Sequence, residues 1–296
     1  MNFYLSFVQG STILIIYYYI CIKLIPKNRI DFLSFNLLFF YHLSFAILYV
    51  AYSIYNVSDA KTIWYVSQFN EFNHYSERIL SLDIWEIGRG SSIILATFLY
   101  KVFKFDYVAM TIFYSLISFT GILLLYSLVS KYKNNNNFNY LSLFLFFPSM
   151  HFWNCSISKD AITFFAISLF IFCFLTFRKY SIWMIISLSI MFLFRPYIGV
   201  VFVFFLFFDF IFNYKIKLVN KIYLITLLSF IFFYLLQFSL SYIGIYINNL
   251  FNIPELYASI SKILSEANKV AQTQSAYIDK GSTYNILYYY FVYRMH

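Results

Sequence analysis

Long apolar runs, separated by short polar segments, occupy most of this sequence. Residues 161–177, AITFFAISLFIFCFLTF, are typical, because no charged residue interrupts them. A strand of a membrane β-barrel would instead alternate apolar and polar positions. A helix needs about 20 apolar residues to cross a bilayer, and it satisfies its backbone polar groups within itself. The pattern therefore predicts membrane-spanning helices.

We predict such helices at eight runs: 3–25, 32–56, 107–130, 138–153, 160–177, 181–194, 197–213 and 221–246. The run 91–103 is too short to span comfortably and is interrupted by Lys101 and closed by Lys104, so we expect an interfacial or re-entrant helix there. The predicted fold class is all-α, a polytopic integral membrane helical bundle. It has about 8–10 spans in one transmembrane domain that covers residues 1–296.

Composition agrees with this pattern. Hydrophobic residues make up 62% of the chain and charged residues 11%, whereas soluble domains have about 25% charged residues. The three cysteines form no CxxC pair or Cys/His cluster, so neither a metal site nor a disulfide framework is predicted. Cys155 alone lies near polar residues, and we expect it to be a small, semi-buried residue and not a reactive thiol. No cofactor is expected, since the chain has no Gly-rich phosphate-binding loop.

Short loops rich in Lys and Arg set the expected orientation, because such loops stay in the cytoplasm. If 91–103 does not span, all four basic loops fall on one side: Lys23, Lys27 and Arg29; Lys131 and Lys133; Arg178 and Lys179; Lys215, Lys217 and Lys221. The opposite face then receives 57–90, 154–159, the turn at 195–196 and 247–285. Ten of the twelve acidic residues lie on that face. The net charge of +9 therefore reflects topology and does not indicate nucleic-acid binding.

The segment 147–160, FPSMHFWNCSISKD, combines a helix break with charged residues. We expect one helix to break at Pro148 and another to begin near Ser158, a suitable N-cap, with Asp160 in its first turn. Capping alone explains Ser158 and Asp160. Lys159 lies at the unfavourable end of the helix dipole, which suggests that it has a partner, either a phosphate or a carboxylate.

Arg195 lies between two apolar runs, in LFRPYIG. An arginine within a membrane segment costs about 2.5 kcal/mol or more on insertion scales and usually serves a site. Because Pro196 breaks the helix, we expect Arg195 at the outer membrane surface near Lys159. Two cations there predict a clamp for a diphosphate, whose oxygens a guanidinium binds bidentately. The alternative is an arginine that snorkels at a helix end.

Asp59 follows the second predicted helix, in NVSDAKTIWY. A carboxylate held there by a rigid helix can act as a general base or orient a hydroxyl nucleophile. For the charges of 71–90 the alternative is a solvated loop, and for the histidine of FPSMHFW it is a structural role. The further candidate contributors to the site are His151, Asp160, Glu86 and Arg89.

Three places in the sequence resemble a known group of proteins: Ser58-Asp59-Ala60, FPSMHFWNCSISKD at 147–160, and FRPY at 194–197. The group comprises the O-antigen and capsular polysaccharide repeat-unit polymerases and the related C-type integral membrane glycosyltransferases. The resemblance implies sugar transfer from a polyprenyl-diphosphate carrier at the periplasmic face of the bacterial inner membrane. The C-type enzymes usually carry catalytic acids in the first outer loop, which corresponds here to Asp59, a single Asp and not an acidic pair.

The resemblance also implies partners. These are a polyprenyl-diphosphate-linked oligosaccharide, the lipid bilayer and other membrane proteins of polysaccharide assembly, and nucleic acid is not among them. A repeat-unit polymerase is the expected activity, with a C-type glycosyltransferase as its alternative. A transporter would show internal repeats and polar residues at mid-membrane near broken helices. An assembly subunit would leave Lys159 and Arg195 without purpose.

The run at 284–296 resembles the start of a span that ends early, at about 11 residues before Arg294, whereas a span needs about 20. Members of the group continue with further helices, so we expect the chain to be a fragment or a shortened gene product. The alternative is an interfacial helix that Arg294 and His296 anchor at the membrane surface.

Cysteine labelling tests the predicted topology. In a background without the native cysteines, Asn73→Cys should react with a membrane-impermeant maleimide from the periplasmic side. Asn135→Cys should react only from the cytoplasmic side, because the basic loops fix the orientation. Reaction of both positions from the same side would contradict the topology and separate the residues of the expected site.

Overall fold

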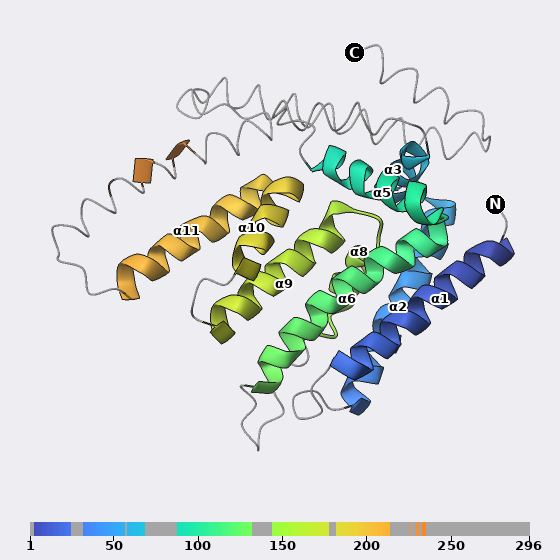
Figure 1. Cartoon of the computed structure of the whole chain (residues 1–296), viewed down its shortest axis with the longest axis horizontal. Coiled ribbons are helices and arrows are strands. Elements are labelled where there is room, and N and C mark those ends of the chain that lie inside the picture. Colours follow the sequence, from blue (N-terminus) through green and yellow to red (C-terminus); the bar gives the residue numbers. More distant parts are fainter. Residues whose placement is uncertain are drawn as a thin grey trace, which may run out of the picture. The chain divides into compact units, whose positions relative to one another are not determined.

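A computed structural model describes residues 3–24, 32–56, 58–68, 88–131, 144–177 and 182–213, with a few positions between 226 and 234 (Figure 1). All of these residues belong to a compact unit that extends from Met1 to Leu236. The predictions for 247–285 and 284–296 lie outside the described residues, as does nearly all of the predicted helix 221–246.

Every regular element in these ranges is an α-helix, and no strand occurs within them. Three helices are long and apolar enough to cross a membrane: α2 (Phe32–Tyr55), α6 (Tyr107–Lys131) and α9 (Lys159–Phe177). Four more contain shorter apolar stretches: α1 (Phe3–Leu24), α5 (Arg89–Phe103), α10 (Ile182–Phe194) and α11 (Pro196–Asn213). The all-α class is thus confirmed for the described part and membrane association is supported. The number of spans stays a prediction.

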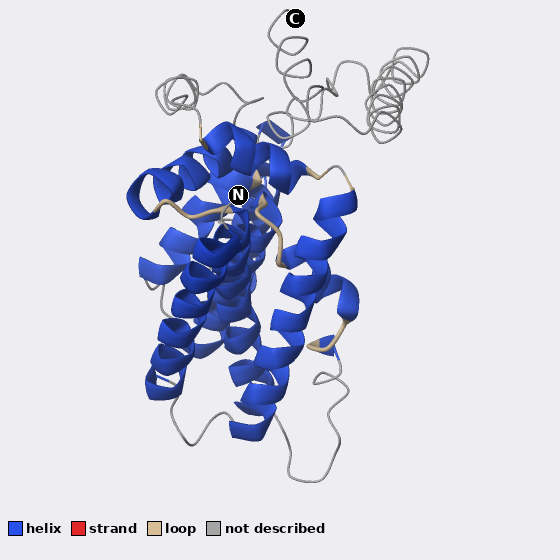
Figure 2. Cartoon of the chain, turned by 90° about the vertical axis from the view of Figure 1, so that its right-hand side faces the viewer, coloured by secondary structure: helices blue, strands red, loops and turns tan. Residues whose placement is uncertain are grey.

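The long helix α6 lies at the centre of this unit. Helices α1, α2 and α9 pack against it, α10 packs on α9, and α11 packs on α10. Figure 1 shows that α1, α6, α9 and α11 run in one direction, whereas α2 and α10 return. Figure 2 shows the same helices from the side, with their axes roughly aligned. The starts of α6, α9 and α11 therefore lie at the same end of the unit.

Helices α6 and α9 approach each other closely at Gly121. A Cβ atom at this position would lie 3.1 Å from the Phe165 Cα and 3.1 Å from the Ser168 Oγ. A larger residue would therefore push the two helices apart. Small residues at such contacts are typical of helices that associate in lipid, where van der Waals packing and not water drives association.

Helix α2 is apolar on both sides. On its inner side Phe35 and Phe39 pack against Phe119 of α6, with ring centroids 6.1 Å and 5.3 Å apart. Leu33 and Ile47 on the same helix remain exposed. A helix that is hydrophobic all round is typical of a fully buried element or of a membrane span.

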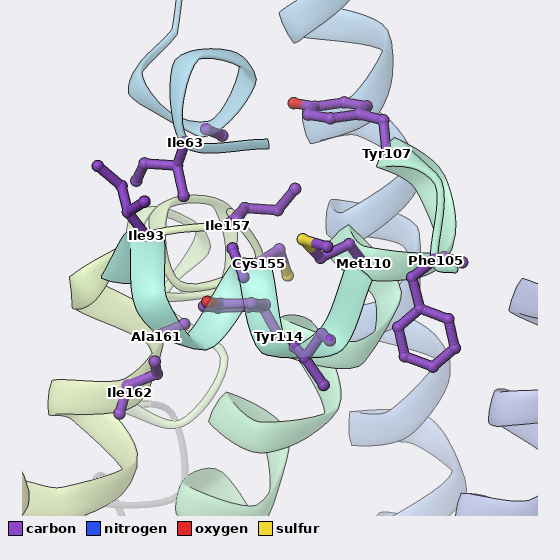
Figure 3. Close-up of a cluster of buried hydrophobic side chains, with 14 of the residues drawn as sticks. Ile63, Ile93, Phe105, Tyr107, Met110, Tyr114, Cys155, Ile157, Ala161 and Ile162 are labelled. Carbon is purple, nitrogen blue, oxygen red and sulfur yellow. The ribbon is translucent and has the colours of Figure 1, made fainter. Parts of the chain in front are cut away.

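A core cluster at one end of the unit joins α5 and α6 to the segment that connects α8 (Pro148–Asn154) with α9 (Figure 3). Ile93, Tyr114, Cys155 and Ile157 are each 1% exposed or less. The connecting segment therefore runs through the core and not over the surface.

The structure corrects the predicted helix 138–153. In the described part of this range, residues 145–147 are not helical. Helix α8 begins at Pro148 and ends at Asn154. Proline is well suited to a first helical position, because the N–H that it lacks would have no partner there. The predicted break at Pro148 is confirmed, but the short helix that Pro148 begins was not predicted.

The expected outer loop 57–90 also contains regular structure. Residues Asp59–Ser67 form helix α3, whose N-cap Ser58 accepts a hydrogen bond from the Lys61 N–H at 3.4 Å. The run DAKTIWYVS is short and mixed in polarity, so the apolar pattern gave no sign of it. The rest of that loop, 69–87, lies outside the described residues.

Candidate functional site

Arg195 occupies the break between α10 and α11, and its backbone makes hydrogen bonds with both helices. Its N–H donates to the Met191 carbonyl at 2.7 Å, which completes α10, and its own carbonyl accepts from the Ile198 N–H at 2.9 Å, which begins α11. Pro196 interrupts the ladder at this point because it has no N–H to donate. The predicted break is confirmed, and it leaves the guanidinium at the end of two helices.

The guanidinium of Arg195 forms an ion pair with the Asp160 carboxylate and donates a hydrogen bond to the Tyr197 hydroxyl. The Arg195 side chain is 24% exposed and that of Asp160 is 42% exposed. This pair is therefore neither sealed in the core nor fully solvated. It joins the start of α9 to the start of α11.

The segment before α9 holds Asp160 in place. The Ser158 Oγ accepts a hydrogen bond from the Asp160 N–H at 3.2 Å, which confirms Ser158 as the cap of this helix. The Ser156 Oγ donates in turn to the Ser158 Oγ at 2.7 Å. Lys159 is the first residue of α9, directly beside the ion pair in sequence, and its carbonyl accepts from the Thr163 hydroxyl at 2.7 Å.

Of the two further candidates, Glu86 and Arg89, the structure describes the backbone of Arg89. Arg89 is the first residue of α5. Two residues later, the Ser91 hydroxyl donates to the Leu193 carbonyl at 2.7 Å, which fixes this end of α5 beside the end of α10 and hence near Arg195. The side chain of Arg89 and the whole of Glu86 lie outside the described residues.

Asp59 begins α3 and its side chain is exposed. Tyr49 of α2, Ala60 of α3 and Ile157 of the segment before α9 belong to one core cluster. The start of α3 therefore lies beside the segment that leads to Asp160. Among the described contacts, none joins Asp59 directly to the Asp160–Arg195 pair.

Two charged groups near this end are partly withdrawn from water. Burial lowers the pKa of Lys61, whose ammonium donates to the Ile54 carbonyl at 3.2 Å, near the end of α2. Burial raises the pKa of Asp106, although its carboxylate accepts from the Ala109 N–H at 2.8 Å and caps α6. Both groups satisfy helix termini, which is a structural role.

A second polar group lies in the interior. His42 of α2 is 1% exposed and His151 of α8 is 0% exposed, and their Nδ1 atoms are 2.9 Å apart. The His42 Nε2 lies 3.0 Å from the Ser115 carbonyl oxygen and 3.1 Å from the Ser118 Oγ. The His151 Nε2 lies 2.6 Å from the Leu145 carbonyl oxygen. His151 is thus part of a buried network and does not reach the ion pair.

Cys155 also contacts this network, through His42. Its Sγ lies 3.4 Å from the His42 Nε2 and 3.5 Å from the His42 carbonyl oxygen, and the side chain is fully buried. Burial raises the pKa of the Cys155 thiol to about 12. A thiol of this kind is protonated at neutral pH and unreactive, in line with the packing role expected for it. Among the described side chains, no group of three His, Cys, Asp or Glu residues is arranged to hold a metal ion.

Sequence reasoning missed His42. It lies near the middle of an apolar run of 24 residues, where an ionisable side chain is costly unless it has a partner. That cost could have indicated that His42 has a partner in the structure. The partner could not be inferred, because it is 109 residues away in the chain.

Comparison with known proteins adds no relative. The chain matches no protein-family model, and neither a curated protein nor a solved structure is significantly similar to it.

A double-mutant cycle tests the ion pair. Asp160→Asn and Arg195→Gln should each lower the thermal stability of the protein in lipid nanodiscs. The double variant should lose less than the sum of the two by about 0.5–1 kcal/mol, because the pair is partly exposed and contributes modestly. As a control, Asp160→Asn is combined with Lys23→Gln. Lys23 lies at the end of α1 that is far from the ion pair, so the two losses of stability should be additive. Additive losses for Asp160 and Arg195 as well would show that the pair contributes nothing.

Proposed function

We propose that this chain transfers a glycosyl group from a polyprenyl-diphosphate-linked donor during assembly of a cell-surface polysaccharide. The reaction we favour is polymerisation of lipid-linked repeat units at the periplasmic face of the bacterial inner membrane. The observation that supports this most strongly is the half-exposed Asp160–Arg195 pair at the junction of three helix ends.

Arg195 would bind the diphosphate of the donor. Its guanidinium is held at the end of α10 by backbone bonds and is oriented by Asp160 and Tyr197. A partly exposed carboxylate can yield its place to a diphosphate, which presents more anionic oxygens to the planar guanidinium. Lys159 and the first N–H groups of α9 would add positive potential at the same end.

Asp59 would act on the acceptor sugar. In this step the acceptor hydroxyl oxygen forms a bond with the anomeric carbon of the donor, while the bond between that carbon and the diphosphate oxygen breaks. The hydroxyl proton passes to the Asp59 carboxylate, and the polyprenyl diphosphate leaves with the electron pair. An exposed carboxylate at the start of a rigid helix suits this role, and no metal or redox cofactor enters the step.

Transport of a lipid-linked sugar is a second candidate, and one observation favours it. The His42–His151 pair is buried near the middle of α2, beside the helix break at Pro148. Ionisable residues at mid-membrane next to broken helices are typical of transporters.

Substitutions at the proposed site test the enzymatic proposal. In a host that lacks the gene, complementation with Arg195→Ala, Lys159→Ala or Asp59→Asn should reduce polymer formation about 10²-fold or more, with the protein level in the membrane unchanged. Lysine should rescue position 195 poorly, because an ammonium cannot replace a bidentate guanidinium. Lys23→Ala and Asp209→Asn, near the opposite helix ends, are matched controls and should make normal polymer.

Purified protein with a lipid-linked oligosaccharide separates the two candidates. A polymerase extends the sugar chain in detergent, whereas a transporter needs a closed vesicle and leaves the sugar unchanged. Normal polymer in all three site variants, or a wild-type protein that never extends the oligosaccharide, would contradict glycosyl transfer.

A further inference from the structure

The buried His42–His151 pair makes three contacts, and each of them needs one proton to become a hydrogen bond. At one end the His151 Nε2 faces the Leu145 carbonyl oxygen, and at the other the His42 Nε2 faces the Ser115 carbonyl oxygen. Between them the two Nδ1 atoms face each other at 2.9 Å. A carbonyl oxygen only accepts, so each outer nitrogen needs a proton to make its bond, and the central contact needs a third.

Two neutral imidazoles supply only two protons. One way to complete the network is to add a third proton, so that the pair carries a single positive charge and every contact becomes a hydrogen bond. The other way uses Ser118, whose Oγ lies 3.1 Å from the His42 Nε2 and 2.9 Å from the Ser115 carbonyl oxygen. When the pair is neutral, the Ser118 hydroxyl donates to the His42 Nε2. When the pair is charged, it donates to the Ser115 carbonyl oxygen.

The surroundings can accommodate both forms. The Tyr41 and Phe45 rings lie 4.8 Å and 5.9 Å from the His151 ring, and the Phe119 ring lies 5.5 Å from the His42 ring. A cation over the face of an aromatic ring is stabilised within about 6 Å, and these three rings lie within that distance of the imidazoles. The Tyr41 phenol and the Cys155 thiol are the titratable groups that contact the pair, and no Asp, Glu, Lys or Arg is among its described contacts. Burial without a countercharge opposes the charged form, so the neutral form is favoured near neutral pH and the proton enters as the pH falls.

We propose that the His42–His151 pair is a buried proton-binding site, which takes up one proton shared between the two imidazoles, and that Ser118 completes the unprotonated form. The site goes beyond the proposed glycosyl transfer and does not depend on it. It joins α2, α6 and α8. Because α8 continues through Cys155 and Ser156 into the cap of α9, the site is connected to the segment that holds Asp160.

Nitrogen-15 NMR of the imidazoles tests the proposal directly. His74→Gln and His296→Gln together leave His42 and His151 as the two histidines of the full chain, which is labelled with ¹⁵N-histidine in lipid nanodiscs. At pH 8 two of the four ring nitrogens should carry protons, the His42 Nδ1 and the His151 Nε2. Between pH 8 and pH 4 a third nitrogen should become protonated, and the pair should take up one proton and not two.

Serine variants in that background show whether the network sets the titration. Ser118→Ala removes from the neutral form the hydroxyl that donates to the His42 Nε2. In the charged form it removes only a bond to the Ser115 carbonyl, which still accepts from the His42 Nε2, so the midpoint should rise by about half to one pH unit. Ser115→Ala keeps the carbonyl oxygen that the network uses and should leave the midpoint unchanged. Ser118→Thr keeps the hydroxyl and should also titrate like the parent. Two protonated nitrogens throughout this pH range, or equal midpoints for the two alanine variants, would overturn the proposal.

Discussion

A hydrogen bond between two buried imidazoles, those of His42 and His151, is the interaction on which the described unit depends most. Helix α8 is only seven residues long, and the residues just before it are not helical. Lipid offers no partners for exposed backbone groups, so such a segment is stable only where protein surrounds it. His151 ties it to α2, and the Tyr41 hydroxyl of α2 adds a bond to the Phe146 carbonyl at 2.9 Å.

The position of the candidate site follows from this attachment. Cys155 and Ile157, which follow α8, are buried in the core between α5 and α6. Ser156 and Ser158 then present the start of α9, so that Asp160 meets Arg195 at the break between α10 and α11. The partly exposed ion pair is thus connected to the fully buried network of His42 and His151, and we expect a change in that network to affect the ion pair.

The sequence predicts features that depend on near neighbours in the chain. The apolar runs predict α2, α6 and α9 because a span is a property of about 20 consecutive residues. Ser158 and Pro196 mark helix boundaries through their own local chemistry, and both predictions hold. The predicted break at Pro148 is also present, but the short helix α8 was missed, since proline can begin a helix as well as follow one.

Pairings between distant residues could not be predicted in this way. The ion pair that Arg195 forms with Asp160, 35 residues away, was not predicted. The missed helix α3 shows a related limit. It is short, and its fit depends on Ala60 and Ile63, which are buried against other helices. Periodicity over nine residues of mixed polarity cannot reveal such packing.

The central claim is that the His42–His151 bond holds α8 in the interior, and a double-mutant cycle at these two positions tests it most directly. His42→Leu and His151→Leu should each destabilise the protein in nanodiscs by about 1–3 kcal/mol, because each leaves a buried nitrogen without its partner. The double variant removes both groups, so it should lose clearly less than the sum of the two. Fully additive losses would contradict the claim, because they would mean that the two imidazoles stabilise the protein independently of each other.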